Sequence, residues 1–461
     1  MTAFLPAGAG TTGGAGTTGG AGAPRDTAAG AGTGAGTGGG HANWLSAFTI
    51  QLVVAVLCVT SIHASRPTVT YRALELGAST FDIGLIQAAF SILPTLLAVV
   101  IGRWVDRTGE GAWMAVAMAF MTIGGVIGTW SDSLLGLGLS QLVMGMGQIL
   151  FLVAGQSMVA NYGPRDGRDV RFGHYATAHS VGQLIGPALA ALVIGGGLWF
   201  AAGGPLAALL PATTPGQAFL VTTLLTAAGM VAALLLPRPG RRGAASGTVR
   251  APQPGLTTMT RQVMGRRGMP AAMVISIIVA SSVDMVIAYL PVYGEEAGLS
   301  VALVGLLLSL RGVAALVSRF YMQHLIELLR RERTLALSMV LAGAGLLALP
   351  FVAPSLEWVL AGLMIAVGLG LGLGQPMTIS WVATISPRSE RATALGVRIT
   401  GNRASLLVIP PVLGAVAGAT GVVAIFVVLA VALLGGAAVA AVTPFDELAE
   451  RPDRPTGAPA T

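Results

Sequence analysis

The sequence predicts an all-α membrane protein made of two six-helix bundles related by internal duplication. Of its 461 residues, 54% are apolar and 10% are charged, whereas soluble proteins carry about 25% charged residues. Apolar runs of about 20 residues, the length of helix that crosses a bilayer, recur along the whole chain. Helices are the expected spanning elements, because a lone strand would leave its backbone groups unpaired in lipid.

Twelve apolar segments qualify as spanning helices, six in each half of the chain. The first six lie near residues 45–65, 83–101, 112–130, 134–157, 174–197 and 216–236. The second six lie near residues 270–292, 302–322, 334–352, 356–383, 394–417 and 421–442. We therefore expect an N-terminal bundle over residues 44–236 and a C-terminal bundle over residues 270–443.

Equivalent residues of the two bundles are 221 to 223 positions apart. At a distance of 221, four residues of the first half recur in the second, as Glu75 and Glu296, Gly77 and Gly298, Ser79 and Ser300, and Gly84 and Gly305. At a distance of 223, three more recur, as Arg168 and Arg391, Gly173 and Gly396, and Pro187 and Pro410. Because the spacing persists from one end of each half to the other, it indicates two parallel repeats of about 200 residues each.

Arginine is the only strong cation of the chain, since the sequence contains no lysine. The link between the bundles, residues 237–269, holds seven arginines and no acidic residue. Loops of this kind face the cytoplasm, and with an even number of spans both chain ends then lie on the same side. The net charge of +7 therefore reflects membrane topology, and we expect no nucleic-acid partner.

Two polar segments flank the bundles. Residues 1–43 form a Gly/Ala/Thr tract that lacks the apolar residues needed for folding, and we expect a disordered cytoplasmic tail. Residues 444–461 are expected to form a second cytoplasmic tail. A composition with arginine as its only long cation and with abundant Gly and Ala is typical of a high-GC bacterial genome, so we expect a bacterial inner-membrane protein.

A turn between the second and third helices carries the residues Gly102, Asp106, Arg107 and Gly109. The glycines allow a tight turn, and a carboxylate there can face the positive end of a neighbouring helix. The segment resembles the loop signature of the major facilitator superfamily, in which this contact latches one conformation, and the resemblance extends over the twelve-helix layout. The second half keeps a partial copy with Glu327 in register with Asp106.

Three other features of the sequence can be compared with that family. The fifth helix contains Gly173, Gly182, Gly186 and Pro187 and resembles the antiporter motif, where small residues allow close helix approach and proline bends the helix. A kinked helix with a purely structural role is the alternative. On the fourth helix, Gln141 stands where proton antiporters of the family often carry an arginine. After the loop signature, Glu110 stands where the family usually has a basic residue.

Ionisable residues inside the predicted spans are the candidates for coupling. A charge in the hydrocarbon costs about 2.5–3.5 kcal/mol or more, and yet the spans contain His63, Arg66, His179 and Asp284. Asp284 is 221 positions after His63, so the repeats place the two at similar depth. We expect Asp284 to meet His63 or Arg66 when the outer side closes, and to act as the proton-responsive member of a gate. A static ion pair between helices is the alternative.

Two arginines near the middle of their predicted helices indicate a positively charged cavity. Arg311 and Arg403 have no comparable supply of acids nearby in the sequence, and arginine offers a planar fork of donors to carboxylate or phosphate. We expect a substrate cavity lined by Arg66, Arg311, Asn402, Arg403, Gln148, Gln183 and Gln375. Arg398 lies nearer the cytoplasmic end, where we expect it to snorkel toward the interface.

The resemblance implies a secondary transporter that works by alternating access, with proton-coupled efflux of a small anionic or amphipathic compound as the expected activity. Proton-coupled uptake of an organic anion, and a membrane receptor that transports nothing, are the alternatives. An enzyme is disfavoured, because the five histidines lack metal-ligand spacing and no lysine is present for a P-loop. We expect no cofactor and no metal. The expected partners are the bilayer, a small-molecule substrate and protons, and the expected state is a monomer.

Overall fold

The computed structural model describes residues 38–108, 110–161, 168–196, 211, 213–236, 261, 263–386 and 391–443. Its described residues form helices and turns without strands, and twelve of the helices are long and apolar enough to cross a membrane. These features confirm the predicted all-α membrane fold. The predicted tails and the arginine-rich link fall largely outside the described residues.

The described part of the first half contains six long helices. They are α1 (Gly38–Glu75), α2 (Thr80–Thr108), α3 (Glu110–Thr129), α4 (Leu134–Asn161), α5 (Arg168–Gly196) and α7 (Thr214–Leu234). The second half contains α9 (Met269–Glu296), α10 (Val301–Phe320), the short α11 (Met322–Leu329), α12 (Arg331–Ala348), α13 (Glu357–Ile385), α14 (Arg391–Thr420) and α15 (Val423–Val442), with a 3-10 turn at Leu349–Phe351. The short helix α11 was not expected from the sequence.

The first helix is longer than predicted. Its expected span ended near residue 65, but α1 continues through Pro67 to Glu75. Beside the proline the Thr68 hydroxyl donates to the Ala64 carbonyl at 2.7 Å, and proline is tolerated inside membrane helices. Consequently Arg66 lies well inside the helix rather than at its end.

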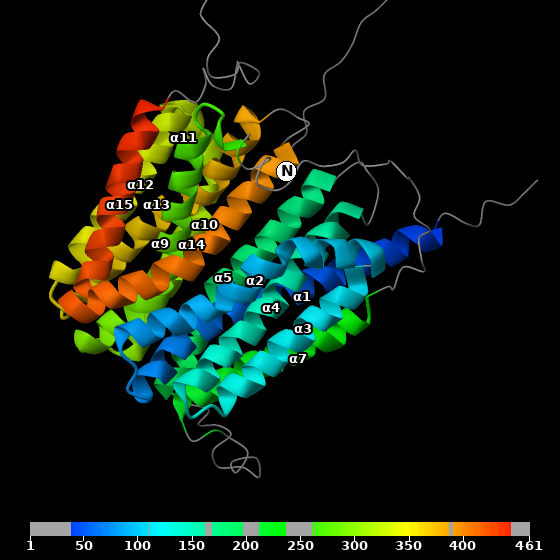
Figure 1. Cartoon of the computed structure of the whole chain (residues 1–461), viewed down its shortest axis with the longest axis horizontal. Helices are drawn as coiled ribbons and strands as arrows, with labels where there is room; N and C mark the ends of the chain where they lie inside the picture. Colours follow the sequence, from blue (N-terminus) through cyan, green and yellow to red (C-terminus); the bar gives the residue numbers. More distant parts are fainter. Residues whose placement is uncertain are drawn as a thin grey trace, which may run out of the picture.

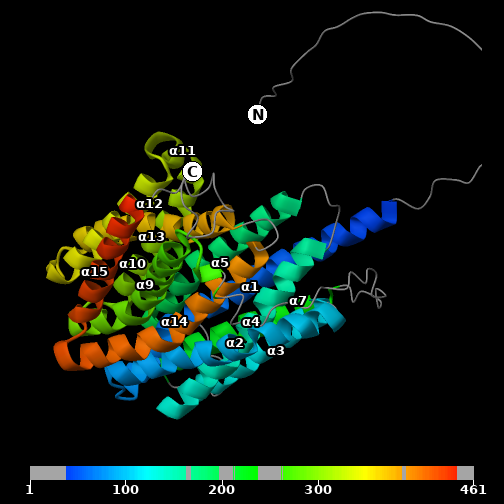
Figure 2. The ribbon, with the colours of Figure 1, turned by 45° about the horizontal axis from the view of Figure 1, so that its top comes forward.

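The two halves lie side by side as separate helix bundles (Figures 1 and 2). Between them, α2 packs along α14, α5 along α10, and α1 against α9. One buried apolar cluster fills the first bundle, and a second fills mainly the second bundle. The space between the bundles is therefore bounded by helices of both halves.

The duplication is visible in the turns that join α1 to α2 and α9 to α10. Gly77 and Gly298 both have positive φ, 74° and 72°, a conformation that favours glycine at the end of a helix. In the first turn the Ala78 amide donates to the Ala73 carbonyl at 2.9 Å, and in the second the Leu299 amide donates to the Gly294 carbonyl at 2.7 Å. Each of these residues is 221 positions from its counterpart, so both halves fold this turn in the same way.

The seam between the halves also follows the repeat. A methyl group at Gly84 of α2 would overlap the Pro410 carbonyl of α14, and one at Gly305 of α10 would overlap the side chain of Ala191 on α5 and lie 3.5 Å from the Pro187 carbonyl. Gly84 and Gly305 are repeat counterparts, as are Pro187 and Pro410. Each half therefore presents a glycine on its second helix to a proline-containing helix of the other half.

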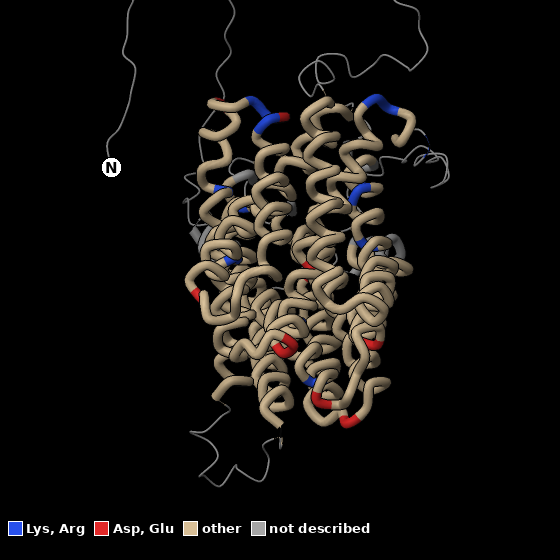
Figure 3. Tube along the Cα trace, turned by 90° about the vertical axis from the view of Figure 1, so that its left-hand side faces the viewer, with Lys and Arg blue, Asp and Glu red and all other residues tan. Residues whose placement is uncertain are grey.

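The two ends of the molecule differ in charge. We call the end with the α1–α2 and α9–α10 turns the far side, and the opposite end, where α1 begins and α15 ends, the terminal side. In Figure 3, arginines gather at the upper, terminal side and most acidic residues at the lower, far side. The acids of the far side include Glu75, Asp82, Asp132, Glu295 and Glu357. This asymmetry agrees with the positive-inside pattern used to orient the chain.

We predict that Gly84→Ala weakens the closed far side. Its methyl group has no space against Pro410, and such overpacking costs about 1–3 kcal/mol, so the thermal unfolding midpoint of the protein in detergent should fall. Gly435→Ala is the control, because a methyl group there meets nothing within 4 Å. Equal midpoints for the two variants would show that the seam tolerates separation.

Candidate functional site

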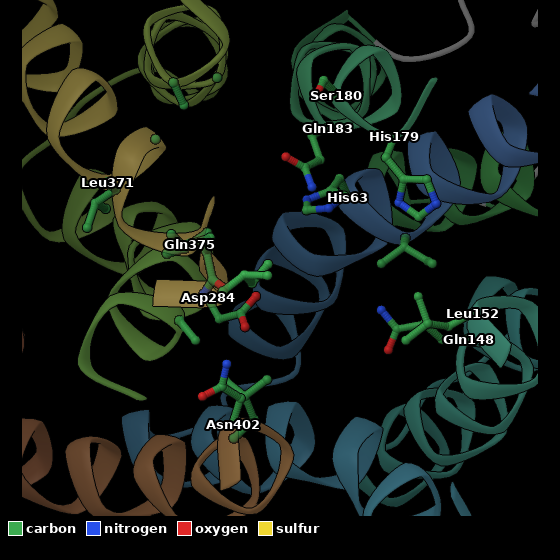
Figure 4. A pocket seen from close by; sticks show the side chains of 18 of the residues that line it. His63, Gln148, Leu152, His179, Ser180, Gln183, Asp284, Leu371, Gln375 and Asn402 are labelled. Carbon is green, nitrogen blue, oxygen red and sulfur yellow. The ribbon is translucent and has the colours of Figure 1, made fainter. Parts of the chain in front are cut away.

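A cavity of about 480 Å³ lies between the two halves. Helices α1, α4 and α5 line it from the first half, and α9, α10, α13 and α14 line it from the second. Figure 4 shows Asp284, Gln375 and Asn402 on one side of this space and His63, Gln148 and Gln183 on the other. The lining includes every residue that the sequence predicted for the cavity or the gate, namely His63, Arg66, Gln148, His179, Gln183, Asp284, Arg311, Gln375, Asn402 and Arg403.

An ion pair between Arg66 and Asp284 joins the halves. The Arg66 Nη1 and Asp284 Oδ1 atoms are 2.5 Å apart, and their side chains are 9% and 16% exposed. The guanidinium carbon also lies 5.2 Å from the centre of the Phe90 ring, a distance at which a cation is attracted to the ring face. Of the two partners that the sequence left open for Asp284, the structure selects Arg66.

Hydrogen bonds surround this ion pair on the far side. The Thr70 hydroxyl donates to the Ala288 carbonyl of α9 at 2.9 Å. The Gln87 amide donates to the Arg66 carbonyl at 3.3 Å. Thr70, Gln87 and Ala288 are all buried, so α1 is held to α2 and α9 where the cavity ends.

A second link between the halves involves Arg403. Its Nη1 donates to the Gln148 Oε1 of α4 at 3.0 Å. The neighbouring Asn402 accepts a hydrogen bond from the Ser276 hydroxyl at 3.1 Å, which fixes its amide oxygen against α9. Arg403 therefore spans the cavity but has a neutral partner.

Arg398 does not snorkel toward the interface, so that expectation was wrong. It is 4% exposed, and its Nη2 donates to the Gln375 Oε1 at 2.8 Å and to the Thr378 Oγ1 at 2.9 Å. Since α14 begins at residue 391, Arg398 lies two turns inside the helix, where its guanidinium reaches acceptors on α13.

Sequence reasoning missed Arg319. It donates from Nη1 to the Ser180 hydroxyl of α5 at 3.1 Å and from Nε to the Gly372 carbonyl of α13 at 3.2 Å. A signal was present, because Arg311, Ala315 and Arg319 recur every four residues and so follow one stripe of α10. All three line the cavity.

Arg311 is the unpartnered cation of the cavity. It is 6% exposed, its Nε is buried without an acceptor, and no hydrogen bond or ion pair joins it to the described part of the chain. The buried Nδ1 of His63 and Nε2 of His179 also lack hydrogen-bond partners among the described residues, although the His179 ring packs edge-on against Tyr175 with centroids 4.6 Å apart. These three buried nitrogens are therefore polar atoms without a hydrogen-bond partner among the described residues.

The described lining is strongly positive. It contains five arginines, Arg66, Arg311, Arg319, Arg398 and Arg403, against the single carboxylate of Asp284. Four positive charges are therefore left in excess. An anion is the ligand charge that this arrangement favours.

The fifth-helix motif packs against α1. A methyl group at Gly182 would lie 2.8 Å from the Thr60 amide, and one at Gly186 would lie 2.8 Å from the Thr60 carbonyl. Pro187 lies inside α5, which remains one continuous helix. Gly173 has nothing within 4 Å of an added methyl group and is exposed, so it takes no part in this close packing.

The predicted latch is only partly described. Gly102, Asp106 and Arg107 lie on α2, their side chains fall outside the described residues, and Gly109 does so entirely. Glu327 lies exposed on α11. Glu110 begins α3 and accepts a hydrogen bond from the Ser157 hydroxyl of α4 at 3.1 Å.

A model of the Major Facilitator Superfamily matches residues 52–309 and 272–460 of the chain. Multidrug resistance protein 1 of Bacillus subtilis is 24% identical over 152 residues, which are 32% of this chain and 36% of that protein. MdtD of Citrobacter koseri, whose name also refers to multidrug resistance, is 23% identical over 156 residues, or 34% of this chain and 32% of that protein. The match thus spans about a third of the length of these curated relatives.

Solved structures share the fold over almost the whole chain. The nucleoside transporter NupG, in a mutant form, superposes with a TM-score of 0.68 at 13% identity and covers 87% of this chain and 99% of its own. A bacterial homologue of the human lysosomal transporter Spinster, inward-facing and unoccupied, superposes with a TM-score of 0.64 at 15% identity and covers 90% and 98%. At these identities the likeness establishes the fold alone.

We predict that Asp284→Asn opens the far side. It leaves the buried Arg66 charge unpaired, and breaking a buried ion pair costs about 3–5 kcal/mol. Labelling of a cysteine introduced at the buried Ala288, in a Cys58→Ala background, should become faster. In the double variant Arg66→Gln with Asp284→Asn, no lone charge remains, and labelling should slow again. If Asp284→Asn leaves the labelling rate unchanged, the pair does not hold this side closed.

Proposed function

The chain belongs to the major facilitator superfamily, and we propose that it is a proton-coupled secondary transporter that exports a small organic anion by alternating access. The observation that carries this proposal is the cavity between the halves, with four positive charges in excess and a buried Arg311 that has no partner in the described part of the chain. Two opposite charges 4 Å apart attract by about 1 kcal/mol in water but by about 4 kcal/mol at an effective dielectric constant of 20. A half-enclosed site therefore holds an anion far better than the surface does.

In alternating access, the two halves would separate and close again at the seam between them. On the far side the halves are joined by Gly84 against Pro410, Gly305 against Ala191, and Arg66 paired with Asp284. The arginine-rich terminal side would face the cytoplasm under the positive-inside rule. Opening toward the outside requires that these far-side contacts separate. Asp106 and Glu327 would latch the terminal side when it closes.

Protons would act through Asp284. Protonation removes its charge and releases Arg66, which weakens the far-side closure and biases the protein toward the outward-open state. His63 and His179 line the same cavity and have buried ring nitrogens free to relay or accept a proton. The ion pair thus converts a proton into a change of conformation.

Export is supported by the names of the two curated relatives, which refer to multidrug resistance, and by the fifth-helix motif. The second candidate is uptake of the anion together with a proton. It is favoured by Gln141, which stands at the place of the antiporter arginine and is fully buried, with its amide donating to the Met144 sulfur at 3.8 Å. A receptor that binds the anion without moving it is the third candidate, since fold does not fix function.

We predict that organic anions discharge the proton gradient of everted membrane vesicles. Respiration acidifies their interior, and an exporter would carry an external anion inward while releasing protons, which a pH-sensitive dye reports. Asp284→Asn should abolish the response. Glu357→Gln should retain it, because Glu357 is an exposed acid at the far-side start of α13. A quaternary ammonium ion should have no effect.

The other outcomes separate the three candidates. If anions leave the everted-vesicle gradient intact but enter right-side-out vesicles when the outside is acidic, the direction is uptake. If anions bind the purified protein and no flux occurs in either orientation, the transport proposal is wrong. A response that survives in Asp284→Asn would remove that residue from coupling.

A further inference from the structure

We infer that the substrate is a small polar dianion, bound with its charged groups toward α10 and α14 and a neutral hydrogen-bonding part toward α4 and α5. This inference rests on the proposed function and narrows its substrate class. Charge is distributed unequally between the two walls of the cavity, which are formed by α10 and α14 on one side and by α4 and α5 on the other. Every arginine of the described cavity lining that is not paired with Asp284 belongs to α10 or α14.

The positive wall consists of Arg311 and Arg319 on α10 and Arg398 and Arg403 on α14. The one described carboxylate of the lining, Asp284, is already paired with Arg66. Its single negative charge balances Arg66, so the four positive charges of this wall have no carboxylate among the described lining residues to balance them. A ligand has to supply the missing negative charge.

The partners of these arginines are neutral or absent. Arg403 and Arg398 donate to the side-chain oxygens of Gln148 and Gln375, Arg319 donates to the Ser180 hydroxyl, and Arg311 has no partner among the described residues. A guanidinium bonds a carboxylate or phosphate roughly twice as strongly as it bonds a neutral acceptor. An incoming anion therefore displaces these partners instead of competing with carboxylates.

The opposite wall is neutral and polar. It carries the amides of Gln148, Gln156 and Gln183 and the hydroxyl of Ser180 on α4 and α5. Gln183 makes no hydrogen bond to the described residues, so its amide group has both a donor and an acceptor to offer a ligand. Amides of this kind suit the hydroxyl or amide groups of a substrate better than a second charge.

Two properties limit the size and shape of the ligand. The cavity holds about 480 Å³, in the lower part of the range of small-molecule sites. Its described lining contains no Phe, Tyr or Trp side chain, and the rings in it are the imidazoles of His63 and His179. The lining fits a dicarboxylate or a phosphate monoester of a few carbon atoms.

Occlusion makes the number of charges matter. When both sides close, water that screens the arginines is expelled, and buried charge without compensation becomes costly. A monoanion would leave three positive charges unbalanced, whereas a dianion leaves two. Every transport cycle passes through this occluded state, and the occluded state therefore favours a doubly charged substrate.

The test compares dianions with monoanions of the same skeleton. The full chain, purified in detergent at constant ionic strength, is heated with succinate or its monoamide succinamate, and with glycerol 3-phosphate or its methyl phosphodiester, which carries a single negative charge; the unfolding midpoint gives the apparent affinity. We expect at least one dianion to bind about tenfold more tightly than its partner compound. The succinate and phosphate arms identify which anionic group is preferred.

Variants assign the preference to the positive wall. Arg311→Gln and Arg403→Gln should each weaken the dianion preference severalfold, while Arg311→Lys, which keeps the charge, should weaken it less. Arg333→Gln is the matched control, because Arg333 is exposed on the terminal side. If Arg311→Gln does not fold, the lysine variant and Arg403→Gln still carry the comparison.

The outcomes keep this inference apart from the transport proposal. Equal affinities for dianions and monoanions, or no shift with any dianion, overturn the inference even if the vesicles show flux. A clear dianion preference without flux in either vesicle orientation supports the inference and overturns transport. A preference that is undiminished in both glutamine variants places the anion elsewhere and also overturns the inference.

Discussion

A guanidinium group inside a membrane is stable only where carboxylates, neutral acceptors or water replace the solvent that it has left. This chain places five guanidinium groups around one cavity and supplies one described carboxylate for them. Neutral oxygens of α4, α5 and α13 hold most of the rest. The positions of α4, α5, α10, α13 and α14 around the cavity therefore depend on bonds to arginine, and the excess charge is what the site offers a ligand.

The duplication gives the two halves the same turns and interhelical contacts, but it does not give them the same charged residues. Both halves repeat the same helix-ending turn, and both present a glycine, Gly84 or Gly305, to a proline-containing helix of the other half. Within this symmetric frame the charged residues differ, because Asp284 occupies the place of His63. One proton on Asp284 can break the ion pair with Arg66, because the two residues carry opposite charges. The symmetric glycine contacts of the seam contain no group that a proton can neutralise.

Much of this arrangement was predictable from the sequence. Apolar length predicted the twelve spans, and the cost of buried charge identified the six ionisable residues among the ten predicted lining residues, since both depend on local sequence and the solvent alone. The choice of Arg66 over His63 as the partner of Asp284 was not predictable, because it depends on how far α1 continues past Pro67. Arg319 and Arg398 were misjudged because their depth depends on where α10 and α14 begin, and helix ends are set by tertiary contacts that periodicity does not encode.

The electrostatics also constrain how a proton and an anion are coupled. A proton on Asp284 frees Arg66 and adds positive charge to the cavity, so it strengthens binding of an anion, and by linkage a bound anion favours that proton. Mutual strengthening at one site favours movement in the same direction. Export in exchange for protons therefore requires that the proton and the anion occupy the cavity in alternate steps, with Arg66 returning to Asp284 before the anion binds. Because Arg66 and Asp284 lie at the closed end of the cavity while Arg319 and Arg398 lie toward the terminal side, an anion arriving from that side meets the positive wall while the pair is still intact.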